Sequence, residues 1–151
     1  GSSAGDPSLR SSDVVTVRVS TWSDPHIKPM RLIESSSRSP SPVDPDNFVL
    51  SGTFQRLLGP DDDMPVRLYR VYFDPGGRTN WHHHDDFQLL LGLSGTCSVV
   101  DRFGHELALG VGDLVMIDPD EEHWHGAAPN THGEHLAINL GLTTIWLESS
   151  A

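Results

Sequence analysis

Three histidines and one glutamine stand at spacings that favour a metal site inside a small β-barrel. His82 and His84 are two residues apart, and side chains two apart on an extended strand point to the same face, whereas His83 points to the other. Gln88 keeps the parity of His82 and His84 if the chain between them stays roughly extended. His123 would come from a distant strand, and imidazoles gathered in this way form a pocket for a divalent first-row metal. The alternative, histidines that only cluster in a polar loop, does not account for the glycines and turns around them.

The chain from Phe48 onward has the pattern of an all-β domain. Short runs rich in β-branched and aromatic residues follow one another, separated by turn sequences such as Asp-Pro-Gly-Gly at 74–77. No window of the sequence has the periodicity of an amphipathic helix, so the pattern predicts a sandwich or a barrel. The expected strands are 67–73, 88–93, 96–100, 106–109, 114–117, 123–127, 135–140 and 144–147.

Residues 1–46 differ in composition from the rest and are expected to form an N-terminal arm, with the barrel at 47–151. The arm is rich in Ser and Pro, and 34–42 resembles a linker. Residues 14–19 alternate well enough for a strand, and 30–33 are a second candidate. We expect the arm to pair with the edge of a barrel, its own or a partner's, in a homodimer.

Net charge and cysteine content limit which partners and which cellular compartment are expected for this chain. A net charge of −11 disfavours nucleic acid and anionic membranes, which leaves a small molecule as the expected partner. Cys97 is the only cysteine, so an internal disulfide is excluded, and a packed small residue is expected there. No stretch nears the roughly 20 apolar residues of a membrane-spanning helix, and no signal peptide is visible, so we expect a cytoplasmic protein. The Gly1-Ser2 start without methionine is typical of an expression scar.

The histidine segment resembles the first motif of the cupin superfamily. That motif reads Gly, five residues, His, one residue, His, three or four residues, Glu, six residues, Gly. Every spacing is satisfied, with Gln in place of Glu, by Gly76, His82, His84, Gln88 and Gly95. The resemblance implies the cupin fold, a double-stranded β-helix or jelly-roll barrel, preceded here by an N-terminal extension.

The second cupin motif is present in a varied form. It reads Gly, five residues, Pro, one residue, Gly, two residues, His, three residues, Asn. Gly112 and His123 hold its Gly and His positions. Asp118 and Asp120 stand where Pro and Gly are usual, and Ala127 stands where Asn is. We interpret the departure as a changed loop that keeps its turn.

A closer likeness is to the small single-domain cupins that include the manganese-dependent hydroxynitrile lyases. Members of that group carry a stretch like 75–82, a His-Trp-His-Gly-Ala block, here 123–127, and a pocket histidine in a His-x-Ala-Ile strand, here His135. The resemblance spans about 48–147. The metal ligands that it implies are His82, His84, Gln88 and His123.

Three imidazoles and an amide oxygen are neutral ligands, so the metal would keep its full double-positive charge. A Glu in place of Gln88 would cancel part of that charge, which makes the Gln version the stronger Lewis acid at some loss of metal affinity. The donor set does not separate Mn, Fe, Co, Ni and Zn. Open coordination positions favour a lyase or isomerase that polarises a substrate oxygen. The alternatives are an iron-dependent dioxygenase of the same fold and a non-catalytic barrel that senses a metal or a ligand.

An acid or base must accompany such a metal. His125 lies two residues after His123 on the same strand face, so its ring is predicted to face the pocket. His135 is the second candidate for a catalytic role. Either ring could transfer a proton near neutral pH, or could instead fix the tautomer of a ligand by a hydrogen bond.

Other candidate residues are expected to lie outside the centre of the site. Asp85 and Asp86 depart from the lyase-like group, which usually has Pro and small residues there. Acidic side chains beside the ligands would either disfavour an anionic substrate or form a second layer around the ligands. The cyanohydrin reaction is therefore not carried over from the resemblance. His83 and His132, like the two aspartates, are expected to face solvent or line the mouth, and loop positions without a site role are His26 and His105.

Overall fold

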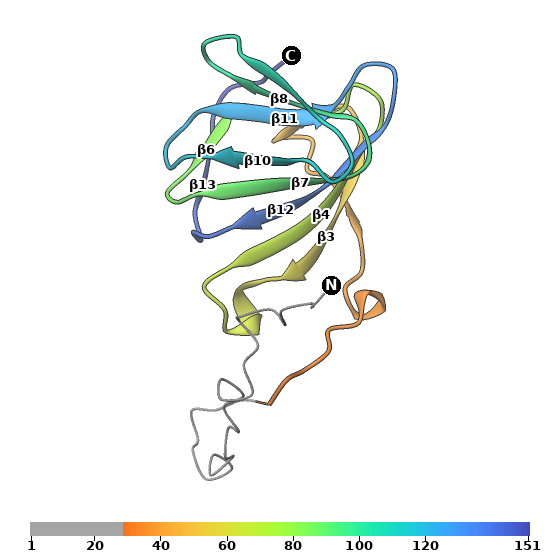
Figure 1. Ribbon diagram of the computed structural model, residues 1–151, viewed down its shortest axis with the longest axis vertical. Coiled ribbons are helices and arrows are strands. Elements are labelled where there is room, and N and C mark those ends of the chain that lie inside the picture. The colour runs from red at the N-terminus through yellow and green to blue at the C-terminus, as the bar shows by residue number, and fades with distance from the viewer. Residues whose placement is uncertain (1–28) are drawn as a thin grey trace, which may run out of the picture. The chain divides into compact units, whose positions relative to one another are not determined.

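Residues 29–151 are the part of the chain that the computed structural model describes, and strands are their main regular secondary structure (Figure 1). Within it, Ile33–Ala151 fold as one unit. No helix in the described range is long and apolar enough to cross a membrane. The short 3-10 helices are Ser35–Ser37 and Pro60–Asp62, and the strands are β1 (Ser41–Pro42), β2 (Phe48–Val49), β3 (Gly52–Leu58), β4 (Arg67–Phe73), β5 (Arg78–Thr79), β6 (His82–His84), β7 (Gln88–Gly95), β8 (Cys97–Asp101), β9 (Glu106–Leu109), β10 (Leu114–Ile117), β11 (His123–Ala127), β12 (Gly133–Asn139) and β13 (Thr144–Trp146).

The strands form two antiparallel sheets. One sheet has the order β1-β3-β4-β12-β7-β10, and the other has the order β13-β6-β11-β5-β2, with β8 paired to β11 and β9 paired to β8. The chain passes from one sheet to the other several times, for example from β7 to β8 and from β11 to β12, which is the connectivity of a jelly roll. The predicted fold class, an all-β jelly-roll barrel, is confirmed.

The apolar core is built from inward side chains of both sheets. Leu90 of β7, Val99 of β8 and Leu109 of β9 belong to one buried cluster, and Phe73 of β4 belongs to another. Cys97 is fully buried in the first cluster, and burial raises the pKa of its thiol to about 12. Cys97 is therefore a packing residue, as the sequence predicts.

The alternation that buries the core also turns polar side chains inward. β12 buries every second residue, and its buried face carries His135 and Asn139. β6 buries His82 and His84 and leaves His83 between them partly exposed. The barrel interior is therefore polar where β6 and β12 contribute to it, and the candidate site lies there.

Two turn positions keep the motif spacings. Gly95 has a φ of 60°, and a Cβ at this position would lie 2.0 Å from the carbonyl oxygen of His132, so a side chain does not fit. Asp120 stands where the second motif has glycine and also has a positive φ, 63°, which aspartate tolerates better than most residues. Its backbone N–H donates to the carbonyl of His84 over 2.8 Å. The changed loop thus keeps its turn and its contact with β6.

The structure differs from the sequence-based expectation near the N-terminus. Residues 30–33 are not a strand: Met30 and Leu32 are exposed, and this segment has no strand partner among the described residues. β3 is a strand that the sequence does not predict, because a register shift near its end breaks the alternation of buried and exposed residues. The strand expected at 14–19 lies outside the described residues.

Candidate metal centre

Two neighbouring strands of one sheet and one strand of the other sheet carry the four predicted ligands. His82 and His84 lie on β6, His123 lies on β11, and Gln88 is the first residue of β7. His82 and His123 are directly opposite each other in the β6–β11 pair, and their ring centroids are 4.3 Å apart. The ring of His84 lies 5.1 Å from that of His82 and 5.8 Å from that of His123. All four side chains are buried.

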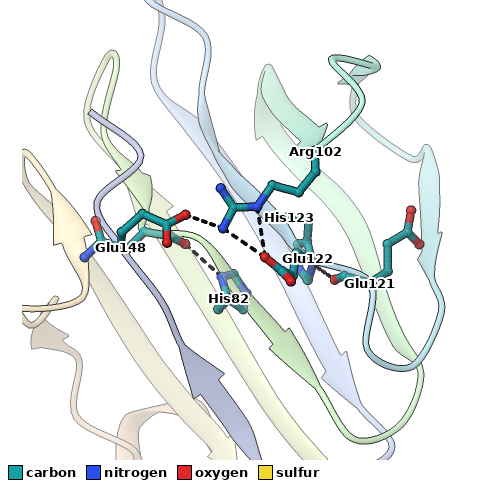
Figure 2. Close-up of polar contacts among 7 residues, drawn as sticks. His82, Arg102, Glu121, Glu122, His123 and Glu148 are labelled. Atoms are coloured by element: carbon teal, nitrogen blue, oxygen red, sulfur yellow. Dashed lines mark hydrogen bonds and ion pairs between the residues drawn. The ribbon is translucent and has the colours of Figure 1, made fainter.

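Backbone carbonyls fix the tautomers of two of these histidines. Nδ1 of His82 lies 2.9 Å from the carbonyl oxygen of Asn80, and Nδ1 of His123 lies 2.7 Å from that of Glu121 (Figure 2). Carbonyl oxygens only accept hydrogen bonds, so each Nδ1 carries the proton and each Nε2 keeps a lone pair. This is the outer hydrogen bond that metal-binding histidines usually make.

His84 presents its second nitrogen in the same way. Its Nδ1 lies 3.1 Å from Oγ1 of Thr144, on the paired strand β13, whereas its Nε2 is buried with no hydrogen-bond partner in the described part of the chain. A buried polar atom without a partner costs free energy. A cation bound at Nε2 would remove that cost.

The amide of Gln88 gives a direct test of whether a cation fits. Its Nε2 donates to Oδ1 of Asn139 over 2.8 Å, which turns its Oε1 toward Nε2 of His123 at 3.1 Å. Both facing atoms carry lone pairs and neither carries a proton, so they repel each other unless a positive charge lies between them. Two metal ligands bonded at about 2.1 Å and at right angles would be about 3.0 Å apart. The arrangement of Gln88 and His123 therefore fits a divalent first-row metal.

Burial keeps the candidate ligands neutral, as metal binding requires. Desolvation lowers the pKa of His123 to about 4 and lowers the pKa values of His82 and His84 from the ordinary value. Neighbouring histidines lower the pKa of His82 further, since two imidazolium charges side by side would repel. At neutral pH the three rings are free bases.

His125 and His135 form a buried pair beside this cluster. Nε2 of His135 lies 2.8 Å from Nδ1 of His125, so a single proton lies between the two rings. One ring nitrogen each of His82, His123 and His125 lies within 4.8 Å of the other two, so these three described histidines, a group that does not include His84, are close enough to hold one ion. Desolvation lowers both pKa values, that of His135 to about 4. Phe73 packs against both rings.

A cavity of about 560 Å³ opens onto the cluster. Its wall includes His82, His84, Gln88 and His125 but neither His123 nor His135, and His135 is hydrogen-bonded to the cavity-lining His125. The remaining wall is mixed: it has apolar and aromatic side chains, among them Phe48, Phe54, Tyr69, Val71 and Trp146, and about as many polar or charged ones. Its volume lies within the range of small-molecule sites.

The two aspartates beside the ligands do not line this cavity. Asp85 accepts a hydrogen bond from the backbone N–H of Thr143 over 3.3 Å, and Asp86 accepts one from the N–H of Phe87 over 2.7 Å. Asp85, which is exposed, thus links the turn between β6 and β7 to the loop before β13, and Asp86, which is partly exposed, bonds within that turn. The other histidines that the sequence places outside the centre of the site do not line the cavity either. His83 faces Asp120 at 3.5 Å, His132 stacks on Tyr72, and His105 pairs with Asp101. His26 is outside the described residues.

Two residues that the sequence does not single out position the ligands. Asn139 holds the amide of Gln88, and the two are directly paired in the β12–β7 register. Thr144 holds the ring of His84 and is its register partner in β13. Strand parity could have found Asn139, because it shares a face with His135 four residues earlier. No local signal points to Thr144.

Arg102 ties the outer side of the site together (Figure 2). Its guanidinium lies 3.9 Å from the ring centroid of Trp81 and pairs with Glu122, at 2.9 Å, and with Glu148. Trp81 directly precedes His82, and Glu122 directly precedes His123. The cluster therefore holds the starts of β6 and β11 next to the C-terminal segment.

The fold and the site define the class. Residues 69–139 match the cupin domain family. The chain is also 43% identical over 119 residues to the (R)-mandelonitrile lyase of Granulicella tundricola, a match that covers 76% of this chain and 87% of that protein. The chain therefore belongs to the cupin family, as its motifs predict.

Solved structures agree with this assignment. A cupin-like protein from Thermotoga maritima superposes with a TM-score of 0.68 at 31% identity, over 81% of this chain and 92% of that one. The polyketide cyclase RemF from Streptomyces resistomycificus superposes with a TM-score of 0.63 at 16% identity, over 82% and 87% of the two chains. At that identity the likeness to RemF is one of fold alone.

Proposed function

We propose that this cupin is a metal-dependent lyase that breaks a carbon–carbon bond next to a substrate hydroxyl. The proposed ligands of one first-row divalent ion are His82, His84, Gln88 and His123. The observation that carries the proposal is the pair of facing acceptors, Gln88 Oε1 and His123 Nε2, at 3.1 Å beside a cavity. When bound, the ion would act as a Lewis acid on a substrate oxygen.

The chain's own residues supply the proton transfer. If His125 donates its Nδ1 proton to Nε2 of His135, its Nε2 keeps a lone pair toward the cavity and can accept the hydroxyl proton of a substrate. His135 then stabilises the resulting imidazolium. The apolar part of the wall, including Phe54 and Val71, excludes water from the reacting group.

The relative named a mandelonitrile lyase suggests a cyanohydrin as the test substrate. In the proposed step the hydroxyl proton goes to His125, the oxygen electrons form the carbonyl, and the bond to the nitrile carbon breaks. Its electron pair leaves with cyanide, which takes up a proton to give hydrogen cyanide. No electron is lost to an oxidant, so the reaction needs no oxygen.

The direct test is the cleavage of mandelonitrile by the metal-loaded protein in an anaerobic chamber. We expect benzaldehyde and hydrogen cyanide to form at the same rate with and without oxygen. Turnover that requires iron and dissolved oxygen would instead assign the site to a dioxygenase. Tight binding of small oxygen donors with no product over hours would assign it to a ligand-sensing barrel.

A second test concerns the ligand set. His84→Ala removes one of three imidazoles, so the purified variant is expected to contain much less than one metal per chain by elemental analysis. His105→Ala is the matched control, because His105 is exposed and pairs only with Asp101. Wild-type metal content in His84→Ala would contradict the proposed centre.

A further inference from the structure

Arg67 stands in the same row of the barrel wall as the proposed ligand Gln88. In the register of the first sheet, Arg67 of β4 is opposite Asn139 of β12, and Asn139 is opposite Gln88 of β7. Residues directly opposite on neighbouring strands share a face, so all three side chains are on the cavity side, and all three line the cavity. At roughly 5 Å per strand, the Cα atoms of Arg67 and Gln88 are about 10 Å apart.

Two nitrogens of the Arg67 guanidinium have no acceptor in the described part of the chain. Its Nε and Nη2 are buried, with no hydrogen-bond partner in the described range, and no ion pair joins it to a carboxylate there. These two nitrogens form one edge of the guanidinium, the edge that pairs with both oxygens of a carboxylate. Two buried guanidinium nitrogens without an acceptor cost free energy that an anion would offset.

The surroundings of Arg67 reinforce its positive charge. Arg56 of β3 also lines the cavity, with its Cζ 5.8 Å from the ring centroid of Tyr69. Within the described lining Asp44 is the one carboxylate, and its oxygens already accept from the backbone of Asp46 and the amide of Asn47. The cavity wall is thus cationic in a chain whose net charge is −11.

We propose that the substrate carries a carboxylate that pairs with Arg67 while its hydroxyl or carbonyl oxygen reaches the metal centre. This inference rests on the proposed function and adds the class of substrate: a small hydroxy or oxo acid, short enough to span about two strand spacings. Arg67 is then a specificity residue. The aspartates next to the ligands do not oppose an anion, because Asp85 and Asp86 lie outside the cavity.

The test compares two ligands that differ only in charge. Mandelate and its neutral amide, mandelamide, are titrated by calorimetry into wild type, Arg67→Gln and Arg70→Gln. Arg70 lies on β4 three residues away with its side chain exposed, so Arg70→Gln removes the same charge from the outer face. We expect wild type and Arg70→Gln to bind mandelate at least about tenfold more tightly than mandelamide, and Arg67→Gln to lose that preference.

Two further experiments exclude other causes of a preference for mandelate over mandelamide. Each titration is repeated on metal-free protein, where a carboxylate has no metal to chelate, and the Arg67-dependent preference should persist. Arg67→Lys keeps the positive charge but lacks the planar guanidinium, so it should retain part of the preference for mandelate. If Arg67→Gln does not fold, Arg67→Lys is the variant that tests the proposal. An unchanged preference in Arg67→Gln, or tenfold tighter binding of inorganic phosphate than of mandelate, would overturn the carboxylate assignment.

The failure of this inference and the failure of the lyase proposal can be told apart. If mandelonitrile is not cleaved but mandelate binds through Arg67, the reaction is wrong and the substrate class stands. If mandelonitrile is cleaved and Arg67→Gln binds mandelate as wild type does, the reaction stands and the carboxylate does not.

Discussion

His125→Ala is expected to keep its metal and its fold while losing 10²- to 10⁴-fold in turnover, the range for a single general acid–base group. The loss follows from position, because His125 is a cavity-lining histidine whose other nitrogen is held by a buried partner, His135, over 2.8 Å. Removing the ring leaves the substrate hydroxyl without a base. The measurement is steady-state cleavage of mandelonitrile, with metal content and a thermal melt recorded for each variant.

The same variant also tests a rival role. A ring nitrogen of His125 lies within 4.8 Å of nitrogens of His82 and His123, so His125 could ligate in place of His84. In that case His125→Ala would lose its metal and His84→Ala would keep it. Wild-type turnover in His125→Ala would instead show that His125 takes no part in the reaction. His132→Ala, on the outer face against Tyr72, controls for the loss of a histidine as such.

The metal-free protein should lose stability steeply as the pH falls from 6.5 toward 4. Burial lowers the folded-state pKa of His123 and of His135 to about 4, whereas in the unfolded chain both titrate near 6.5. Between these values the unfolded state binds more protons, so stability is complete above pH 6.5 and declines below it. Each histidine contributes about 3 kcal/mol to the decline. Urea unfolding at pH 7.5 and pH 4.5 measures it.

A non-titrating variant identifies the source of this dependence. His135→Gln should show a smaller difference between the two pH values, even if it is less stable at both. His105→Gln, at an exposed position, should keep the wild-type difference. Equal stability of the metal-free wild type at pH 7.5 and 4.5 would show that the buried rings are charged in the folded protein.

Strand parity accounts for most of what the sequence predicts about the site. The alternation of faces in β6 and β11 places His82, His84, His123 and His125 inward without any knowledge of which strands pair. Parity depends only on the local backbone, so a short motif carries it. The same reasoning predicts the all-β class, because turn residues and β-branched runs are also local.

Site residues whose position depends on which distant strands pair could not be predicted from strand parity. Asn139, Thr144 and Arg67 reach the site because β12 lies between β4 and β7 and because β13 pairs with β6. Strand order depends on the packing of the whole domain. The strand β3 was missed for a similar reason, since its bulge is defined only against β4. Sequence also does not show that Asp85 points to a backbone N–H and not to the cavity.

The three consecutive histidines of β6 make the centre unusually intolerant of insertions and deletions. β6 pairs through His82 with β11 and through all three residues with β13, so its register is set from both sides. A slip by one residue would turn His83 inward and both His82 and His84 outward. The number of imidazoles offered by β6 would fall from two to one in a single step. Substitutions at the cavity wall leave this register unchanged, whereas an insertion or deletion next to β6 would abolish the proposed metal binding.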